Sequence, residues 1–289
     1  MKPLRVALLG CGRIADLAHL PVLLALPDVD VVALADRDAE RRRTAARLAH
    51  GVPAFEDFMD AIERSSADAA VICLPPALHA PAAIAAFSAG LHVYLEKPLA
   101  LETAEAAAVL AAWRESGRTG VIGFNFRFHP LVERLRRALS AGTIGEVVAA
   151  RSMFTSSARS HPAWKASRAT GGGALLNLGS HHLDLVPYLL GEAVAEVSAA
   201  VRSGAAEQDS AAVRLQLESG TIVQSLFSNG AAASDRWELI GRDGRITMDR
   251  YGGSLIVEGA TRVTARAARL GQAMRTAGRE ITRALRRDE

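Results

Sequence analysis

Residues 5–15 read RVALLGCGRIA: an apolar run, two glycines one residue apart, and an alanine three positions later. The pattern is G-x-G-x-x-A, placed between a predicted strand and a helical run. Gly10 would form the tight turn, Gly12 would let the backbone approach a pyrophosphate, and Ala15 would let the helix pack closely on the strand. Phosphates would then lie at the positive end of the helix. The stretch predicts a dinucleotide-binding turn.

Asp36 strengthens this prediction. It follows the second strand-like run, 21 residues after Ala15, where a carboxylate can bind a ribose 2′-hydroxyl. The alternative is that Asp36 caps a helix over residues 38–49, and it could serve both needs. Its charge would repel a 2′-phosphate and therefore favours NAD, although Arg37 could partly offset that repulsion. We expect NAD as the cofactor and leave NADP open.

Short apolar runs alternate with alanine-rich helical stretches over residues 1–124, as in βαβ units. The predicted strands are Arg5–Leu9, Val29–Ala35, Asp68–Leu74, Leu91–Leu95 and Gly120–Phe124. The predicted helices are Arg41–His50, Pro81–Ala89 and Glu102–Glu115. This order indicates an α/β Rossmann domain, with a doubly wound parallel sheet covered on both faces.

The pattern changes in residues 125–289. A predicted helix over Leu131–Ser140 is followed by longer strand-like segments. These are Val147–Phe154, Ala195–Val201, Ala211–Leu217, Thr221–Ser228, Arg236–Ile240 and Ser254–Val257. We expect an α+β C-terminal domain with a mostly antiparallel open sheet and a basic tail.

Composition narrows the function classes. The 289 residues are 49% hydrophobic and 22% charged, as in a soluble protein of two domains. Only Cys11 and Cys73 occur, which fits a reducing compartment without disulfides, and the opening residues do not resemble a secretory signal. We therefore expect a cytoplasmic protein.

Two features could suggest a membrane or a nucleic acid. Residues 69–95 lack Asp, Glu, Lys and Arg, but prolines, a glycine and histidines divide them, so we expect buried α/β interior and no membrane insertion. The excess positive charge lies in the tail, which has eight arginines and three acidic residues from Arg262 onward. The body therefore gives no sign of nucleic-acid binding.

Residues 171–184 read GGGALLNLGSHHLD. Three glycines suggest a loop that something must approach closely. A helix over Ala174–Leu190 would carry Asn177, His181 and Asp184 on one face, with His182 pointing off that face. Such a polar stripe is either a site or a hydrogen-bonded surface.

Glu96, Lys97 and Pro98 follow the strand at Leu91–Leu95. A lysine there would point into the crevice where parallel sheets bind ligands, although it could also be a surface lysine in a turn. With G-x-G-x-x-A, the acidic residue after the second strand and GGG…H…D, this motif resembles the Gfo/Idh/MocA oxidoreductases. Residues 123–130 also look like the segment that joins that family's two domains, and the resemblance runs from about residue 4 to about 258.

The resemblance implies hydride transfer between NAD(P) and a hydroxyl-bearing carbon of a sugar, amino sugar, uronate or cyclitol, which the C-terminal domain helps to bind. It implies catalytic roles for Lys97 and His181, and a homodimer or homotetramer formed through the C-terminal sheet. A histidine suits proton transfer near neutral pH, and a lysine ammonium can stabilise a developing alkoxide. No metal is expected.

Asn177 departs from the aspartate that many members carry at this position. An amide cannot take a proton, so Asn177 can orient a substrate hydroxyl but cannot be the base. This leaves His181 as the stronger candidate for acid–base work, with Lys97 as its partner, and argues against a simple inositol dehydrogenase. Asp184 could orient His181 or be structural.

The remaining predicted site residues flank these motifs. Arg127 and Lys165 are candidate substrate ligands beside Asn177 and Asp184. The predicted cofactor site comprises Gly10, Gly12, Arg13, Ile14, Asp36, Arg37, Pro75, His79, Glu96 and Lys97.

Other functions compete with a sugar dehydrogenase or reductase. One is a nucleotide-dependent sensor without turnover, and another is an NAD-dependent glycosidase; tetrapyrrole reduction fits less well. The resemblance also implies a further C-terminal helix, for which the sequence has no clear equivalent. Thr264–Arg287, with arginines at turn spacing, is a candidate for a solvated or partner-facing helix.

Overall fold

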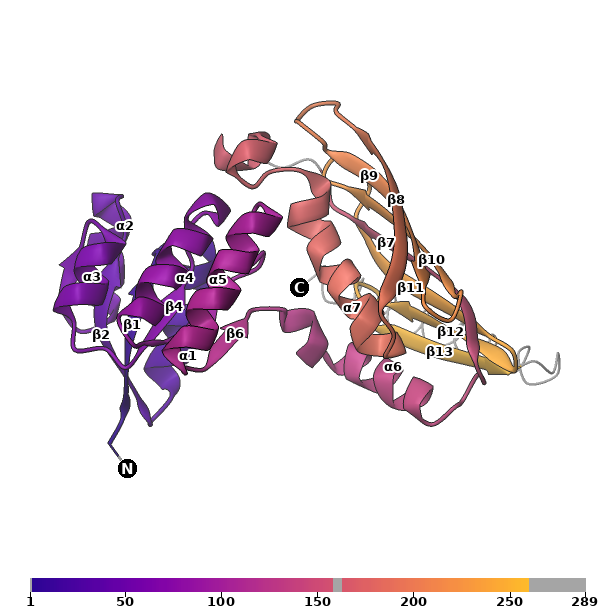
Figure 1. Cartoon of the computed structure of the whole chain (residues 1–289), viewed down its shortest axis with the longest axis horizontal. Coiled ribbons are helices and arrows are strands. Elements are labelled where there is room, and N and C mark those ends of the chain that lie inside the picture. The colour runs from indigo at the N-terminus through magenta and orange to yellow at the C-terminus, as the bar shows by residue number, and fades with distance from the viewer. Residues whose placement is uncertain (1, 158–162, 260–289) are drawn as a thin grey trace, which may run out of the picture. The chain divides into compact units, whose positions relative to one another are not determined.

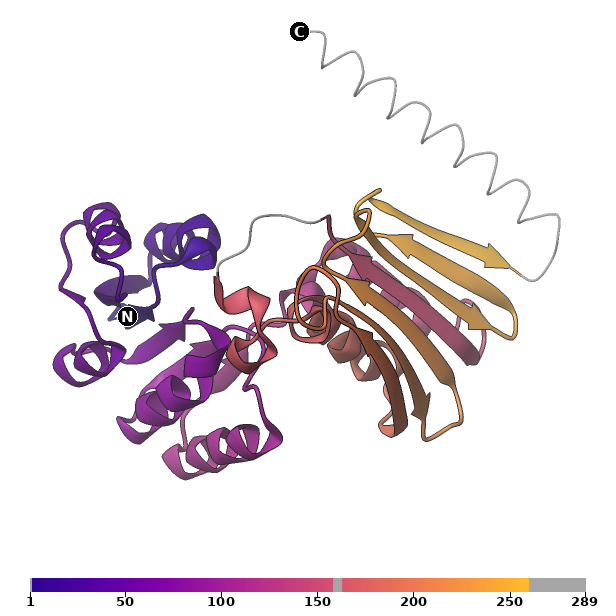
Figure 2. The same ribbon diagram turned by 90° about the horizontal axis from the view of Figure 1, so that it is seen from above.

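The computed structural model describes residues 2–157 and 163–259, and it divides into two compact units. Of the described residues, the first unit contains 2–124 and 163–172, and the second contains 125–157 and 173–259 (Figures 1 and 2). The sequence predicts the boundary after residue 124 but assigns the segment before Gly172 to the second domain. The C-terminal tail, including the candidate helix Thr264–Arg287, lies outside the described residues.

The first unit is built on a six-stranded parallel sheet in the order β3-β2-β1-β4-β5-β6. Its strands are β1 (Leu4–Leu9), β2 (Val29–Ala35), β3 (Ala54–Phe55), β4 (Ala69–Ile72), β5 (His92–Leu95) and β6 (Gly120–Ile122). Its helices are α1 (Leu20–Ala25), α2 (Ala39–Leu48), α3 (Phe58–Arg64), α4 (His79–Ser88) and α5 (Thr103–Ser116). The strand order reverses between β1 and β4, which is where such sheets bind ligands.

Alternate residues of β1 explain why helices cover both faces of this sheet. Ala7 and Leu9 pack in a core with α3, α4 and α5, whereas Val6 and Leu8 pack in another with residues of α1 and α2. Both sets are buried, so the strand reads as a continuous apolar run. The predicted doubly wound sheet is confirmed, and residues 69–95 form β4, α4 and β5 within it.

The second unit contains a seven-stranded sheet in the order β13-β12-β11-β7-β10-β9-β8. Its strands are β7 (Val147–Thr155), β8 (Val194–Arg202), β9 (Ser210–Leu217), β10 (Ile222–Ser228), β11 (Ser234–Gly241), β12 (Gly244–Asp249) and β13 (Ser254–Gly259). Only the β7–β10 pair is parallel among the described pairs, so the predicted mostly antiparallel sheet is confirmed.

Helices α6 (Pro130–Ser140) and α7 (Ser180–Leu190) lie against one face of this sheet (Figures 1 and 2). They share a core with the inward residues of the strands, among them Phe227 and Trp237. The prediction of a continuous α-helix over Ala174–Leu190 is wrong in its first turn. Leu175–Gly179 (η6) is a π-helical turn that precedes α7.

No described helix has the length and apolar character needed to cross a membrane.

Candidate functional site

The glycine turn after β1 has the conformation that the sequence predicts. Gly10 has φ +96°, and a Cβ there would lie 2.6 Å from the carbonyl oxygen of Cys73, so no other residue fits. A Cβ at Gly12 would meet no atom within 4 Å. The backbone at Gly12 is therefore open to an approaching ligand, as a pyrophosphate requires. The helical run that follows begins with a π-helical turn, η1 (Ala15–His19), and continues as α1.

Asp36 lies directly after β2 and fastens the glycine turn. Its Oδ2 accepts a hydrogen bond from the backbone N–H of Cys11 at 2.8 Å, and its Oδ1 accepts one from the N–H of Asp38 at 2.8 Å. The alternative helix-cap role belongs instead to Asp38, whose side chain accepts from the N–H groups of Glu40 and Arg41. Asp36 is thus held at the end of β2 beside the turn, where its carboxylate can serve a ribose.

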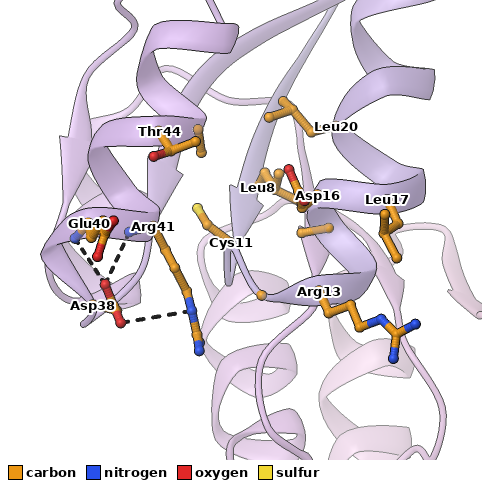
Figure 3. Close-up of a pocket in the computed structure, with 13 residues that line it drawn as sticks. Leu8, Cys11, Arg13, Asp16, Leu17, Leu20, Asp38, Glu40, Arg41 and Thr44 are labelled. Carbon is orange, nitrogen blue, oxygen red and sulfur yellow. Dashed lines mark hydrogen bonds and ion pairs between the residues drawn. The ribbon is translucent and has the colours of Figure 1, made fainter.

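A cavity of about 740 Å³ lies between this turn and α2 (Figure 3). Among the predicted cofactor residues, Gly12 and Arg13 line it. Further polar residues that the motif did not indicate also line it, namely Asp16, Asp38, Glu40, Arg41 and Thr44.

The two cysteines of the first unit are unreactive. The thiol of Cys11 faces the same cavity, and burial, followed by the charge of Asp36, raises its pKa to about 12. Burial also raises the pKa of Cys73 far above its usual value. Both side chains therefore stay protonated near neutral pH, and neither is a nucleophile.

Lys97 follows β5 and carries a strongly perturbed amine. Burial lowers its pKa to about 8, and the charge of Lys165 acts in the same direction, whereas Glu96 opposes both. Glu96 itself binds Nε2 of His19 through Oε1 at 2.7 Å. Its Oε2 accepts from the backbone N–H of Lys97. An amine with a pKa near 8 can both donate and accept a proton near neutral pH.

Lys97 should therefore destabilise the fold, which gives a test. We expect Lys97→Met to raise the melting temperature by a few degrees at pH 7, because the apolar side chain removes a buried charge. The folded-state pKa is depressed, so the cost of that charge is complete below about pH 8 and disappears as pH approaches the unfolded value of 10.5. The increase in melting temperature, measured by circular dichroism, should therefore shrink between about pH 8 and pH 10.5. An equal gain at all pH values would contradict this assignment.

Lys165 contributes a second amine to the first unit. It lies on the short helix Ala163–Ala166, and burial followed by the charge of Arg13 lowers its pKa. Arg13, Lys165 and Lys97 thus form a chain of mutually repelling cations that begins beside the glycine turn. Such a set favours an anionic ligand.

His79 and Pro75 lie at the carboxyl end of β4. His79 is buried, with Nδ1 2.6 Å from the carbonyl oxygen of Pro98 and Nε2 2.8 Å from that of Leu74. Burial lowers its pKa. These contacts make His79 a support that joins the ends of β4 and β5. Pro75, Ile14 and Arg37 are exposed, and their contact with a cofactor stays a prediction.

The three glycines have an explanation in the chain's own packing. A Cβ on Gly171 would lie 2.6 Å from the ring of Pro76, and one on Gly172 would lie 2.3 Å from the carbonyl oxygen of Lys165. Gly173 has φ +94°. Each position therefore favours glycine without any ligand.

Asn177 and Asp184 have different partners in the second unit. Nδ2 of Asn177, within the π-helical turn, donates to Oδ1 of Asn229 at 2.9 Å. Asp184 accepts from the guanidinium of Arg127 through both carboxylate oxygens, one contact being 2.8 Å from Nε. Of the two roles expected for Asp184, these contacts support the structural one, because they clamp residues 125–128 (η3) onto α7. Arg127 as a substrate ligand stays a prediction.

His181 stacks on Phe126 of η3, with ring centroids 4.1 Å apart and planes inclined by 15°. Its neighbour His182 points off this face, as expected, and is fully buried against Phe154 and Trp237. Nε2 of His182 lies 3.3 Å from Oδ1 of Asp235. The other oxygen of Asp235 accepts from Arg250. Motifs in the sequence did not point to this buried cluster.

Asp235 could have been noticed, because it alternates with Trp237 and Leu239 on the inward side of β11. A carboxylate at a core-facing position predicts a buried ion pair. No cluster of three potential metal ligands occurs among residues 2–157 and 163–259.

Comparison with known proteins gives matches over most of the chain. The sequence model of an oxidoreductase family with an NAD-binding Rossmann fold matches residues 4–124, and that of a GFO/IDH/MocA C-terminal domain matches residues 132–247. A dTDP-3,4-didehydro-2,6-dideoxy-alpha-D-glucose 3-reductase of Streptomyces violaceoruber is 34% identical, covering 86% of this chain and 74% of the relative. The myo-inositol 2-dehydrogenase of Thermotoga maritima is 29% identical, covering 88% and 78%.

Among solved structures, KijD10, a 3-ketoreductase from Actinomadura kijaniata in complex with NADP and TDP-benzene, superposes with a TM-score of 0.82. It is 29% identical, and the match covers 90% of this chain and 82% of that one.

Proposed function

Since this chain belongs to the Gfo/Idh/MocA family of NAD(P)-dependent oxidoreductases, we propose that it interconverts a hydroxyl and a keto group on a sugar ring, with Lys97 and His181 moving the proton. The observation that carries the proposal is the amine of Lys97 at the carboxyl end of β5, whose burial lowers its pKa to about 8. The reaction would take its hydride from, or give it to, a bound nicotinamide. The residues around Gly12, Arg13 and Asp36 would hold the dinucleotide.

Each residue has a distinct chemical task. In the reductive direction the Lys97 ammonium donates a hydrogen bond, and then a proton, to the oxygen of the carbonyl. In the oxidative direction a neutral Lys97 or His181 takes the hydroxyl proton. Asn177 cannot ionise and is assigned to orienting a substrate hydroxyl, with Lys165 and Arg127 as candidate ligands for further polar groups.

The relatives and the charge of the first unit support the substrate class that we propose. Three relatives at 34%, 32% and 32% identity are 3-reductases of one dTDP-activated keto sugar. The cationic set of Arg13, Lys165 and Lys97 favours an anionic ligand, which a nucleotide-activated sugar would be. We therefore propose a keto sugar or its alcohol, with the nucleotide-activated form preferred over free cyclitols.

The experiment is a screen by NAD(P)H absorbance. Purified protein is mixed with free sugars, uronates, amino sugars, inositols and a dTDP-activated 3-keto-2,6-dideoxy sugar, with each cofactor in turn. Turnover of a sugar or activated sugar supports the proposal. Bound cofactor without turnover on the whole panel would favour the sensor, and release of an aglycone without net NADH would favour the glycosidase.

We also propose a homo-oligomer formed through the open face of the second unit's sheet. Outward-facing apolar side chains share that face: Met153 (39% exposed), Ile222 (37%), Leu226 (44%) and Ile240 (40%). Met153 pairs with Leu226, and Ala149 lies between Ile222 and Ile240. The row between these two apolar sets holds Gln224 and the Arg151–Glu238 ion pair. A stable interface buries about 800 Å² on each partner, and a sheet face of seven strands can supply that area.

Leu226→Glu should therefore convert the oligomer to monomers, because a charge would be buried at the centre of that interface. The mass is measured by size-exclusion chromatography with light scattering. Leu48→Glu, which changes another exposed leucine on α2, is the matched control and should leave the mass unchanged. A monomeric wild-type protein at micromolar concentration would refute this assembly.

The cytoplasm is the location that we propose, because the free cysteines Cys11 and Cys73 suit a reducing compartment.

A further inference from the structure

Phe126 lies between a cation and an imidazole. The guanidinium carbon of Arg250 is 4.0 Å from the centroid of the Phe126 ring, and the ring of His181 is 4.1 Å from the same centroid. Two groups that close to one centroid would overlap on a single face, so they occupy opposite faces. The three side chains form a column in the order Arg250, Phe126, His181.

Arg250 is fixed at the far end of this column. Its Nε and Nη2 lie 2.7 and 2.6 Å from Oδ2 of Asp235, and its backbone N–H donates to the Asp235 carbonyl oxygen. Asp235 is 1% exposed, and its Oδ1 faces His182. Burial acts to raise the pKa of Asp235, but His182 and Arg250 outweigh it and hold the pKa below its usual value. The carboxylate therefore stays charged and keeps Arg250 in place.

The middle of the column is fixed as well. Phe126 is 9% exposed, and the next residue, Arg127, is clamped to Asp184 on α7. An imidazole that must stay nearly parallel to an immobile ring cannot rotate freely about its χ2 torsion. His181 would otherwise have two faces and two ring nitrogens to present to a substrate.

We propose that Arg250 and Phe126 are positioning residues, which hold the His181 imidazole in the orientation that proton transfer requires. The proposal rests on the proposed function, because it assumes that His181 handles the proton. The mechanism is geometric: a small misplacement of a reacting group costs a large factor in rate.

Phe126→Leu tests the column. Leucine keeps the site apolar but cannot stack, so kcat should fall at least about tenfold while KM stays within about twofold. Phe227→Leu is the matched control. Phe227 belongs to the same core and is fully buried, but its ring meets His182 edge to face rather than stacking on His181. It should change kcat by less than about twofold.

Arg250→Lys is the second variant. It tests the same column if Phe126→Leu does not fold. Lysine keeps the charge opposite Asp235 but has no planar group to cover Phe126. We expect kcat to fall about threefold with an unchanged KM.

A second measurement reports on the His181 ring itself. It is the NMR spectrum of the imidazole nitrogens in protein labelled with ¹⁵N at histidine. The His181 signals are identified by their loss in His181→Asn. They should shift or broaden in Phe126→Leu and Arg250→Lys and stay unchanged in Phe227→Leu. Unchanged His181 signals, or equal kcat losses in Phe126→Leu and Phe227→Leu, would overturn the proposal. Wild-type turnover by His181→Asn would instead contradict the proton-transfer role of His181 in the proposed function. The spectra would still show whether Phe126 and Arg250 fix the orientation of the His181 ring.

Discussion

Lys97→Ala and His181→Ala are each expected to lower kcat/KM by about a thousandfold, with most of the loss in kcat. A positioned acid or base contributes about a hundredfold to ten-thousandfold, and a group that acts only in the transition state lowers kcat rather than raising KM. Lys97 is suited to this work because its pKa is lowered to about 8, so both of its protonation states are accessible near neutral pH. The measurement is steady-state absorbance of NAD(P)H with a substrate found in the screen.

The double variant is the sharper part of this test. If Lys97 and His181 act on one proton, removing both should cost little more than removing either, because residues that act as a unit are not additive. A loss of about a millionfold in the double variant, the product of the two single losses, would show that the two residues act independently. Lys2→Ala and His50→Asn change the same residue types at exposed positions and should leave turnover unchanged. Wild-type rates in either single variant would remove that residue from the mechanism.

The sequence predicts those features that depend on local geometry. Gly10 and Gly12 can be predicted because a tight turn after a strand admits few residue types. Asp36 can be predicted because it directly follows the next strand. The fold class follows from the alternation of apolar runs with helical stretches. Strand β3, with two residues, and the short helix α3 are too brief to show a period. Strand β12 escapes prediction because glycine and arginine begin it, leaving few apolar residues to mark it.

Features that depend on tertiary contacts could not be read in this way. A Cβ at position 171 would clash with Pro76, which is distant in the sequence. The partner of Asp184 is Arg127 rather than His181, because η3 lies along α7. The column of Arg250, Phe126 and His181 joins three segments whose meeting depends on strand register. The site residues could be listed from motifs, but the groups that hold them required coordinates.

Asp36→Ser is expected to shift the preference between cofactors toward NADP by roughly a hundredfold in the ratio of kcat/KM values. Like charges about 4 Å apart repel by about 4 kcal/mol at an effective dielectric constant of about 20, and solvent reduces this in an open site. Serine removes the charge but keeps an oxygen that can accept from the Cys11 N–H, so the glycine turn should survive. The exposed Arg37 beside it could then pair with a 2′-phosphate.

Asp57→Ser supplies the control for this change. Asp57 caps α3 by accepting from the N–H of Met59, and serine is an equally good cap, so the variant loses the same charge in the same unit without disturbing a helix. It should leave the cofactor ratio unchanged. Equal shifts in both variants would mean that net charge rather than the ribose contact sets the preference. An unchanged ratio in Asp36→Ser would mean that Asp36 serves only to fasten the glycine turn, and that specificity comes from the residues lining the cavity beside α2.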